Sequence, residues 1–341
     1  MSWKRGLAAT ALRYSASLRA LQSLSKYRAK QLTILAYHRV GERVDPEDYP
    51  FDHDFISATP KDFAWQMKYV KRHFNPITFV DVVAHLDGRK KLPPRPLIVT
   101  FDDGFDDNYH IAYPILKQAG VPATMFVCTG YIGQEKTFWF DRVVYLVKNT
   151  RVHQFDLGLP GGPTILEATA RSRYQQARQL VLFLRSIDNQ ERLKYVELLE
   201  IQLGEALEDT SIESKPMTWE MVVEMANDGI EIGSHSVSHP NLTQLTPDAL
   251  RQELVDSSQQ IADCTGQTPL AIAYPAGDKQ NFNDQVRAIS ESSGYSIAAS
   301  YVSGVNPVDA MERYSLSRLH IESYTGKNEF AAMLELPVVF A

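Results

Sequence analysis

A run of strand-forming residues that ends in two adjacent carboxylates constrains this chain more than any other feature. Leu97 to Phe101 are apolar, β-branched or aromatic, which is typical of a strand buried on both faces. Asp102 and Asp103 follow directly, and Gly104 permits a sharp exit from the strand. Parallel α/β folds place their chemistry at the carboxyl ends of such strands. Two adjacent carboxylates at that position repel each other unless a cation or a proton separates their roles.

Strand and helix patterns alternate along most of the chain and are joined by short connections. Strand, helix and strand in succession are typical of a βαβ unit, so we expect an α/β fold with a parallel sheet or barrel. A length of 341 residues allows one α/β barrel or two smaller domains. Besides the central strand, strands are expected at residues 32–38, 77–79, 122–127, 230–233, 270–274, 295–299 and 316–321.

Residues 135–217 interrupt this alternation. The mostly apolar residues 138–147 predict one helix, and residues 166–203 predict a longer helical stretch. We interpret the segment as a helical insertion that folds against the barrel, within a single unit that spans residues 32–341. Its aromatic side chains either line a substrate groove or pack in a core, and core packing is the favoured interpretation.

The first part of the chain differs in charge from the remainder. Residues 1–41 hold eight basic residues and no acidic residue, whereas the rest of the chain holds 27 basic and 41 acidic residues. An acidic body argues against nucleic acid as the main partner. Apolar residues at helical spacing predict a basic amphipathic helix over residues 3–28, within a separate N-terminal element, residues 1–31. This helix either lies on an anionic membrane surface, as a peripheral contact, or packs on the protein's own body.

Signals for membrane insertion and secretion are weak. No uninterrupted apolar run approaches the ~20 residues that a membrane-spanning helix needs. The N-terminal segment also lacks a convincing cleavage site. The sequence therefore favours a cytoplasmic or membrane-associated location over a secreted or periplasmic one.

Two histidines follow another predicted strand and indicate a metal site. His235 and His239 come directly after the strand at residues 230–233, and they differ from the H-E-x-x-H pattern of helical zinc proteases. Two imidazoles and one carboxylate are a common catalytic zinc set, and they also resemble the facial triad of non-haem iron(II) enzymes. One aspartate would bind the cation, and the other would remain free to accept a proton from water whose pKa the cation lowers toward ~7. Cys128 and Cys264 have no C-x-x-C spacing, so a thiolate zinc site is not predicted.

These residues resemble two motifs of the polysaccharide deacetylases of carbohydrate esterase family 4, the NodB-homology domain. Residues 100–104, TFDDG, match the first motif, and residues 235–239, HSVSH, match the second, H-[ST]-x-x-H. The resemblance implies an irregular (β/α)7-type barrel, whose matching core covers about residues 32–134 and 218–322. It also implies a divalent metal, typically Zn²⁺, with Asp102 as the catalytic base and Asp103, His235 and His239 as the metal ligands.

The third family motif, R-x-P-Y, is only half present. This chain has Ala-Tyr-Pro-Ala-Gly at residues 273–277, so the arginine that usually orients and tunes the base is missing. The backbone N–H of Ala276 can still serve as an oxyanion donor, because a main-chain donor does not depend on the side chain. Arg318, on the last predicted strand, is our candidate for the replacement cation.

The family's general acid comes from an L-x-x-H motif that usually lies near the C-terminal end. Leu316 and His320 have the wrong spacing, whereas Leu35 and His38 have the right spacing near the N-terminus. This order resembles the circularly permuted poly-N-acetylglucosamine deacetylases, which also carry an A-Y-P form of the third motif. We therefore favour His38 over His320 as the general acid. A barrel makes this order sensible, because its first and last strands are neighbours.

The function that these residues predict is metal-dependent removal of N-acetyl groups from an N-acetylhexosamine-containing polysaccharide or oligosaccharide. The expected partner is therefore a carbohydrate. Three alternatives remain: a deacylase or deformylase of a lipid-linked sugar, a non-catalytic carbohydrate-binding homologue, and a metal-dependent phosphodiesterase. Binding alone needs no adjacent base, and a two-metal phosphodiesterase site needs more ligands than this chain offers.

Overall fold

The computed structural model describes residues 30–159, 162–204 and 214–340. The predicted basic helix at residues 3–28, with its predicted membrane contact, lies outside the described residues. Within the described ranges, every helix is too short or too polar to cross a membrane.

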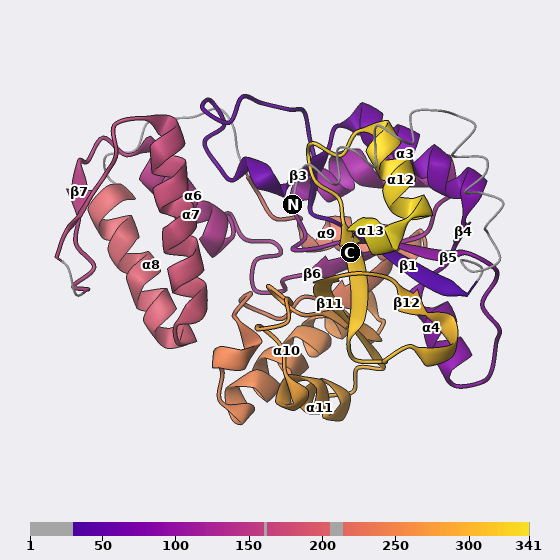
Figure 1. Cartoon of the computed structure of the whole chain (residues 1–341). Coiled ribbons are helices and arrows are strands. Elements are labelled where there is room, and N and C mark those ends of the chain that lie inside the picture. Colours follow the sequence, from indigo (N-terminus) through magenta and orange to yellow (C-terminus); the bar gives the residue numbers. More distant parts are fainter. Residues whose placement is uncertain (1–29, 160–161, 205–213, 341) are drawn as a thin grey trace.

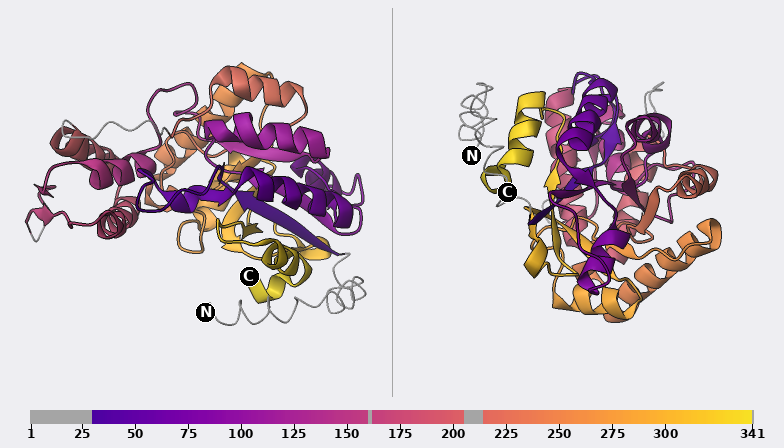
Figure 2. Two further views of the ribbon diagram at one scale, coloured as in Figure 1. Left: turned by 90° about the horizontal axis from the view of Figure 1, so that it is seen from above. Right: turned by 90° about the vertical axis from the view of Figure 1, so that its right-hand side faces the viewer.

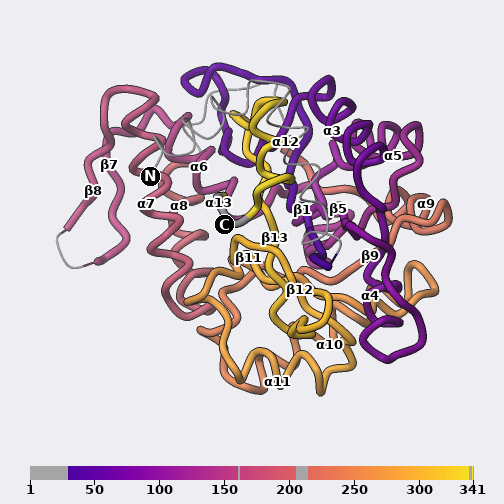
Figure 3. Tube along the Cα trace, turned by 45° about the vertical axis from the view of Figure 1, so that its right-hand side comes forward, coloured from indigo at the N-terminus to yellow at the C-terminus, as the bar shows by residue number. Residues whose placement is uncertain are grey.

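Seven parallel strands of the described chain close into a barrel (Figure 1). The first strand, β1, pairs with β5 on one side and with β13 on the other, so it fills the gap between the last strand and the central one. Figure 3 shows β1 beside β13 and β5. The predicted α/β barrel is confirmed. In order around the barrel, the strands are β1 (Gln31–Tyr37), β5 (Pro96–Phe101), β6 (Ala123–Val127), β9 (Glu231–Ser234), β10 (Ala271–Ala273), β11 (Ile297–Ser303) and β13 (Leu316–His320).

Helices surround the barrel because each presents an apolar face to the strands and a polar face to solvent. In helix α3, for example, Phe63, Met67 and Val70 are fully buried against the strands. Helices α10 and α11 lie together on one side of the barrel, and α12 packs on α3 on another (Figures 1 and 2). These helices are α3 (Pro60–His73), α4 (Phe79–Leu86), α5 (Tyr113–Ala119), α9 (Trp219–Asn227), α10 (Pro247–Thr265), α11 (Asp284–Ser292), α12 (Lys327–Glu335) and α13 (Pro337–Phe340).

Short strands extend or flank the barrel, and one of them corrects a sequence prediction. The prediction of a strand at residues 77–79 is wrong, because the strand that pairs with β5 here ends at Pro76. Thr78 instead caps helix α4, and its backbone N–H donates to the carboxylate of Asp81 at 3.2 Å. The short strands are β2 (Arg39–Val40), β3 (Ile56–Ala58), β4 (Asn75–Pro76) and β12 (Asn306–Pro307).

The segment between β6 and α9 forms a helical group on one side of the barrel (Figures 1 and 2). Helices α6, α7 and α8 pack on one another, and their apolar side chains continue into the barrel through a shared cluster. Phe105 and Cys128 of the barrel belong to that cluster, together with Phe138 and Leu184. The helices are α6 (Trp139–Asn149), α7 (Ala170–Ser186) and α8 (Asn189–Leu203), with a hairpin of β7 (Gln154–Phe155) and β8 (Thr164–Ile165) between α6 and α7.

Candidate active site

The carboxyl ends of the parallel strands bring the predicted site residues to one end of the barrel. Tyr37 of β1 pairs with Phe101 of β5, so His38 and Asp102 leave neighbouring strands at the same level. The backbone N–H of Asp102 donates to the carbonyl of Tyr37 at 2.9 Å. On the other side of β5, β6 pairs with β9, which places His235 in the same layer because its N–H donates to the carbonyl of Val127 at 2.9 Å.

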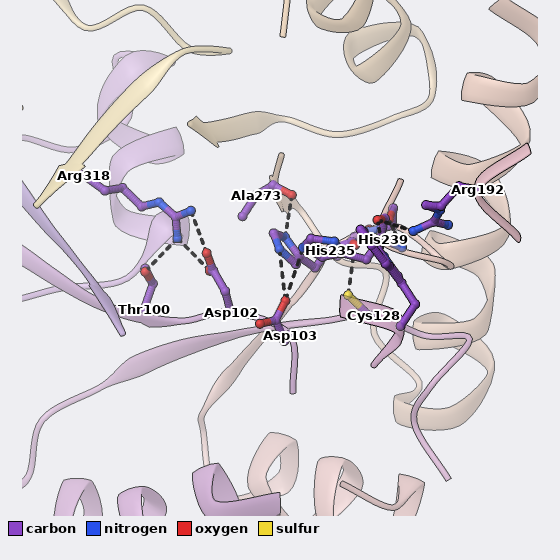
Figure 4. Close-up of polar contacts among 12 residues, drawn as sticks. Thr100, Asp102, Asp103, Cys128, Arg192, His235, His239, Ala273 and Arg318 are labelled. Atoms are coloured by element: carbon purple, nitrogen blue, oxygen red, sulfur yellow. Dashed lines mark hydrogen bonds and ion pairs between the residues drawn. The ribbon is translucent and has the colours of Figure 1, made fainter. Parts of the chain in front are cut away.

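Asp102 is buried and is held by a bidentate ion pair with Arg318 (Figure 4). Nη1 of Arg318 donates to Oδ1 of Asp102 at 2.7 Å, and Nη2 donates to Oδ2 at 2.8 Å. Nε of the same guanidinium donates to the carbonyl of Ser300 at 2.8 Å, which fixes its plane. Burial raises the pKa of Asp102, but the charge of Arg318 outweighs burial and holds the pKa below its usual range. Asp102 is therefore ionised at neutral pH.

Asp103 faces two imidazoles, whereas Asp102 faces Arg318 (Figure 4). Its Oδ1 lies 3.5 Å from Nε2 of His235 and 3.4 Å from Nε2 of His239. Nδ1 of His235 lies 2.8 Å from the carbonyl of Ala273, a contact that places the ring proton on Nδ1 and leaves Nε2 free to act as a ligand.

The three side chains fit a divalent cation. Both carboxylate oxygens of Asp103 are buried without a hydrogen-bond partner among the described residues. Burial and the nearby charge of Asp102 raise the pKa of Asp103, so its charge is unbalanced in the protein alone. Two imidazoles and one carboxylate form a donor set typical of catalytic zinc. The position between them is thus a candidate metal site, and a bound cation would supply the missing positive charge.

The backbone at this end of the barrel is strained where the site residues lie. Asp103, Ser236, His239 and Ala276 adopt positive φ angles of 74°, 65°, 52° and 58°, in the left-handed region that most side chains avoid. Such strain persists only where the surrounding structure holds it in place, and it often accompanies function. Gly104, which follows Asp103, has φ 94°, and a Cβ on it would lie 2.9 Å from Ile132.

Cys128 lies close to the metal position, which the sequence did not indicate. Its Sγ, a carboxylate oxygen of Asp103 and a ring nitrogen of His235 all fall within 4.8 Å of one another. The thiol nevertheless donates to the carbonyl of His235 at 3.3 Å, and burial raises the pKa of the thiol well above its usual value. A neutral thiol with that orientation is a packing residue beneath the site, because a ligand would have to be a thiolate.

A cavity of about 390 Å³ opens over these residues. Its volume is within the range of small-molecule sites. Barrel residues form one side of it, and residues of α6 and α7 form the other. The barrel side includes His38, Asp102, His235, His239, Tyr274, Ala276 and Tyr301, and the helical side includes Trp139, Phe140, Arg178, Val181 and Arg185.

Of the two candidate acids, the structure brings His38 to the cavity wall. Its ring contacts those of Phe55 and Tyr301 edge-on, with centroids 5.1 and 5.7 Å apart. Burial lowers the pKa of His38 to about 4, although the charge of Asp102 opposes the effect. His320 stacks instead on Tyr301, with ring centroids 3.6 Å apart, and the cavity wall does not include it.

Ala276 also lies on the cavity wall, in the turn after β10. The structure gives its backbone N–H no acceptor among the described residues. The turn is held against β11, because the N–H of Tyr301 donates to the carbonyl of Gly277 at 2.6 Å. A free main-chain donor on a fixed turn is suited to a substrate oxygen.

Comparison with known proteins agrees with this geometry. Residues 89–298 match the polysaccharide deacetylase family. This chain belongs to that family. YxkH of Bacillus subtilis, provisionally named a polysaccharide deacetylase, is 23% identical over 306 residues, which cover 89% of this chain and 76% of that protein.

Two further relatives illustrate the range of similarity. The poly-beta-1,6-N-acetyl-D-glucosamine N-deacetylase of Staphylococcus aureus is 29% identical over 130 residues, which cover 35% of this chain and 43% of that enzyme. The structure of the deacetylase PplD of Streptococcus pyogenes, in complex with acetate, matches with a TM-score of 0.58 and 21% identity, over 91% of this chain and 98% of that one. At this identity the structural match shows the fold.

The helical segment of this polysaccharide deacetylase contributes contacts that the sequence did not predict. Arg192 of α8 is buried and donates to the carbonyl of His239 at 3.1 Å (Figure 4). Nε1 of Trp139 donates to the same carbonyl at 3.2 Å, and the guanidinium of Arg192 lies over the Trp139 ring, 4.5 Å from its centroid. These two side chains therefore hold the strained backbone of a candidate metal ligand. Trp139 and Phe140 both pack in a core and line the cavity.

A second acidic group, which includes the cavity residues Asp52 and Asp54, was also not predicted. Asp52, His53 and Asp54 bring possible ligand atoms within 4.8 Å of one another. Asp52 already accepts hydrogen bonds at 2.7 Å from Tyr174 and from Arg178, both on α7. Its charge is balanced by Arg178, so this group chiefly ties the helical segment to the barrel.

Proposed function

We propose that this polysaccharide deacetylase removes N-acetyl groups from N-acetylhexosamine residues of a polysaccharide or oligosaccharide, with a divalent cation, typically zinc, as cofactor. The observation that carries the proposal is the division of the two adjacent aspartates. Asp102 is charged and paired with Arg318, whereas Asp103 is unpaired and faces His235 and His239. That division supports a base and a ligand in neighbouring positions, which a binding module would not need.

In the proposed mechanism, Asp103, His235 and His239 hold the cation. When bound, the cation would lower the pKa of a water molecule and polarise the amide carbonyl of the substrate. Asp102 accepts the proton that this water loses as its oxygen attacks the carbonyl carbon. Arg318 keeps Asp102 ionised and fixes the carboxylate plane, so the base is ready at neutral pH.

The remaining groups serve the carbonyl oxygen and the leaving nitrogen. The N–H of Ala276 donates to the carbonyl oxygen as it gains negative charge, and this donor is already in place before the reaction. His38 gives a proton to the nitrogen as the C–N bond breaks, which yields acetate and a free amine. Its lowered pKa keeps His38 neutral at neutral pH before the reaction, so the proton that it gives is the one that Asp102 took from water, passed on to His38 before the amine departs.

Mass spectrometry of N-acetylglucosamine oligomers tests the proposal. The protein is treated with a chelator, and loss of acetyl groups is then followed before and after addition of Zn²⁺. We expect loss of about 42 Da per acetyl group removed only after Zn²⁺ is restored. An N-formyl sugar carried on a lipid is assayed in parallel, and activity confined to it would contradict the acetyl assignment.

A variant of Asp103 tests the proposed metal ligand. Asp103→Asn should abolish zinc-dependent turnover, because it removes the only carboxylate that faces both histidines in the described structure. Asp263→Asn, the same change on the exposed surface of α10, is the matched control and should retain full activity. Full activity of Asp103→Asn would show that the proposed site is wrong.

A further inference from the structure

One cation on the cavity wall has no role in the mechanism above. Arg185 lies near the end of α7, and its side chain lines the cavity. Its guanidinium makes no hydrogen bond, ion pair or ring contact with any residue that the structure describes. Outside the hydrogen bonds of the helix, its backbone carbonyl accepts from Nδ2 of Asn241 at 3.3 Å.

Each of the other arginines around the cavity has at least one protein partner for its guanidinium. Arg318 pairs with Asp102, and Arg192 donates to main-chain carbonyls. Arg178 pairs with Asp52 at 2.7 Å. Among the described arginines of the site, Arg185 alone has a guanidinium without a protein partner.

No acidic residue that the structure describes forms an ion pair with Arg185, although the charges of Asp278 and Asp52 act on it from beyond ion-pair distance. Asp54 lies 3.8 Å from the guanidinium of Arg178, and Glu322 has contacts of its own. Burial lowers the pKa of Arg185, and the charge of Arg178 adds to the effect. A partly desolvated guanidinium without a carboxylate is unfavourable unless a ligand completes it.

We propose that Arg185 binds an oxyanion, a carboxylate or a phosphate, on the sugar unit next to the N-acyl sugar. This inference rests on the proposed function and names its substrate class as an anionic glycan. A guanidinium offers planar paired donors that match either oxyanion. Trp139 and Phe140 line the same cavity and offer apolar surface to a sugar ring. Arg185 would bind the oxyanion of the neighbouring sugar unit.

Kinetics on three substrates test the inference. The neutral substrate is fully N-acetylated chitotetraose, and the carboxylate substrate is a hyaluronan tetrasaccharide. The phosphate substrate is N-acetylated chitobiose 1-phosphate, whose phosphate lies on the unit next to the non-reducing N-acetyl sugar. We expect Arg185→Gln to lower kcat/KM about 10- to 100-fold on the oxyanion substrate that the enzyme prefers, chiefly through KM. Chitotetraose turnover should change by less than about threefold. The preferred substrate then identifies carboxylate or phosphate as the ligand.

Two further variants make the result specific. Arg171→Gln is the same substitution at an exposed position of the same helix, and it should leave all three substrates unaffected. Arg185→Lys keeps the charge but not the planar paired donors of a guanidinium. Its kcat/KM on the preferred oxyanion substrate should therefore lie between those of wild type and Arg185→Gln. An equal fall in kcat on all three substrates would overturn the inference, because the guanidinium would then serve the reacting amide itself.

Binding measurements separate this inference from the proposed function. If no substrate is deacetylated, isothermal titration calorimetry of the same three compounds to wild type and Arg185→Gln still reports the anion preference. Tighter binding of an anionic compound to wild type, lost in Arg185→Gln, would support the subsite without turnover. Equal binding of neutral and anionic compounds to wild type would overturn it.

Discussion

Arg318 and Asp102 are 216 residues apart in the chain, and the guanidinium of Arg318 contacts both carboxylate oxygens of Asp102. The two residues belong to β13 and to the end of β5, and β1 lies between these strands. Both side chains are shielded from solvent, and burying two charges costs free energy. The ion pair offsets this cost because the guanidinium contacts both carboxylate oxygens. The guanidinium also donates to Thr100 at 3.2 Å, which in turn donates to the carbonyl of Leu35 at 2.8 Å.

Replacement of Arg318 should change the pH dependence of catalysis. Arg318→Lys keeps a positive charge, but an ammonium group cannot hold both oxygens, so the pKa of Asp102 should rise. Because the base must be ionised, the acidic limb of the kcat/KM profile should then move to higher pH. We expect kcat/KM at neutral pH to fall about 100-fold. Steady-state kinetics between about pH 5 and pH 8 measure both effects.

A buried pair elsewhere provides the control for this variant. Arg95 contacts Glu335 at 2.7 Å, with only 16% of its side chain exposed, far from the site in the fold. Arg95→Lys should lower stability without moving the pH profile. Arg318→Met should be less stable than wild type by about 3–5 kcal/mol, because it leaves Asp102 charged and unpaired. An unshifted acidic limb in Arg318→Lys would contradict the tuning role.

Zinc should stabilise the folded protein through Asp103, and Cys128 should not be required. A ligand that binds only the folded state raises its stability, so the thermal midpoint should rise with Zn²⁺ concentration after chelator treatment. The increase should disappear in Asp103→Asn. Cys128→Ala should keep the increase, because the thiol donates to the carbonyl of His235 and does not face the metal as a thiolate. Loss of the zinc response in Cys128→Ala would make the thiol a ligand.

The parts of the site that could be predicted are those fixed by local sequence. Residues that directly follow a buried strand, such as Asp102 and His235, must meet at one end of a parallel barrel. The alternation of strand and helix patterns along the chain also predicted the strands and helices of the barrel. The prediction of a strand at residues 77–79 failed because a local capping interaction of Thr78 with Asp81 outweighed an apolar pattern.

Other parts depend on long-range packing that no short pattern contains. In the sequence, Arg192 cannot be told from any other arginine of a helix. Only the packing of α8 against α6 brings it to the carbonyl of His239. Arg185 likewise becomes part of the cavity because α7 folds over the barrel. Strand β12 has only two residues. Its antiparallel pairing with Gln31 and Leu32 of β1 depends on the path of the chain between β11 and β13 rather than on its own composition.

Loss of the contacts to His239 should weaken metal binding. Arg192→Met keeps the apolar stem over Trp139 but removes its hydrogen bonds to the carbonyls of His239 and Ser238. We expect zinc affinity to fall about 10- to 100-fold, as for other groups that orient metal ligands. Competition with a zinc-binding dye measures this affinity without turnover. Arg142→Met is the matched control, since Arg142 of α6 pairs with Glu200 on the surface and should not affect zinc.

Stability should fall at acidic pH because buried histidines are held neutral in the folded protein, among them His38 and His320, which lie outside the candidate metal ligands. Burial lowers the pKa of His38 to about 4 and that of His320 to about 3, whereas a histidine in an unfolded chain titrates near pH 6.5. Above about pH 6.5 both residues are neutral in both states and no stability is lost. Below that pH the unfolded chain takes up protons that the folded chain does not, so the free energy of unfolding decreases until the folded histidines are protonated as well.

The loss for His38 is at most on the order of 3 kcal/mol, and it is reduced because the side chain borders the cavity and is partly exposed there. Urea denaturation of the metal-free protein between about pH 7.5 and pH 4.5 measures the loss. His38→Gln and His320→Gln should each flatten the decline toward acidic pH, because glutamine takes up no proton in either state. His153→Gln, at an exposed histidine, should leave the decline as it is in wild type. If neither buried variant flattened the decline, these two imidazoles would not be the groups that the folded state keeps neutral.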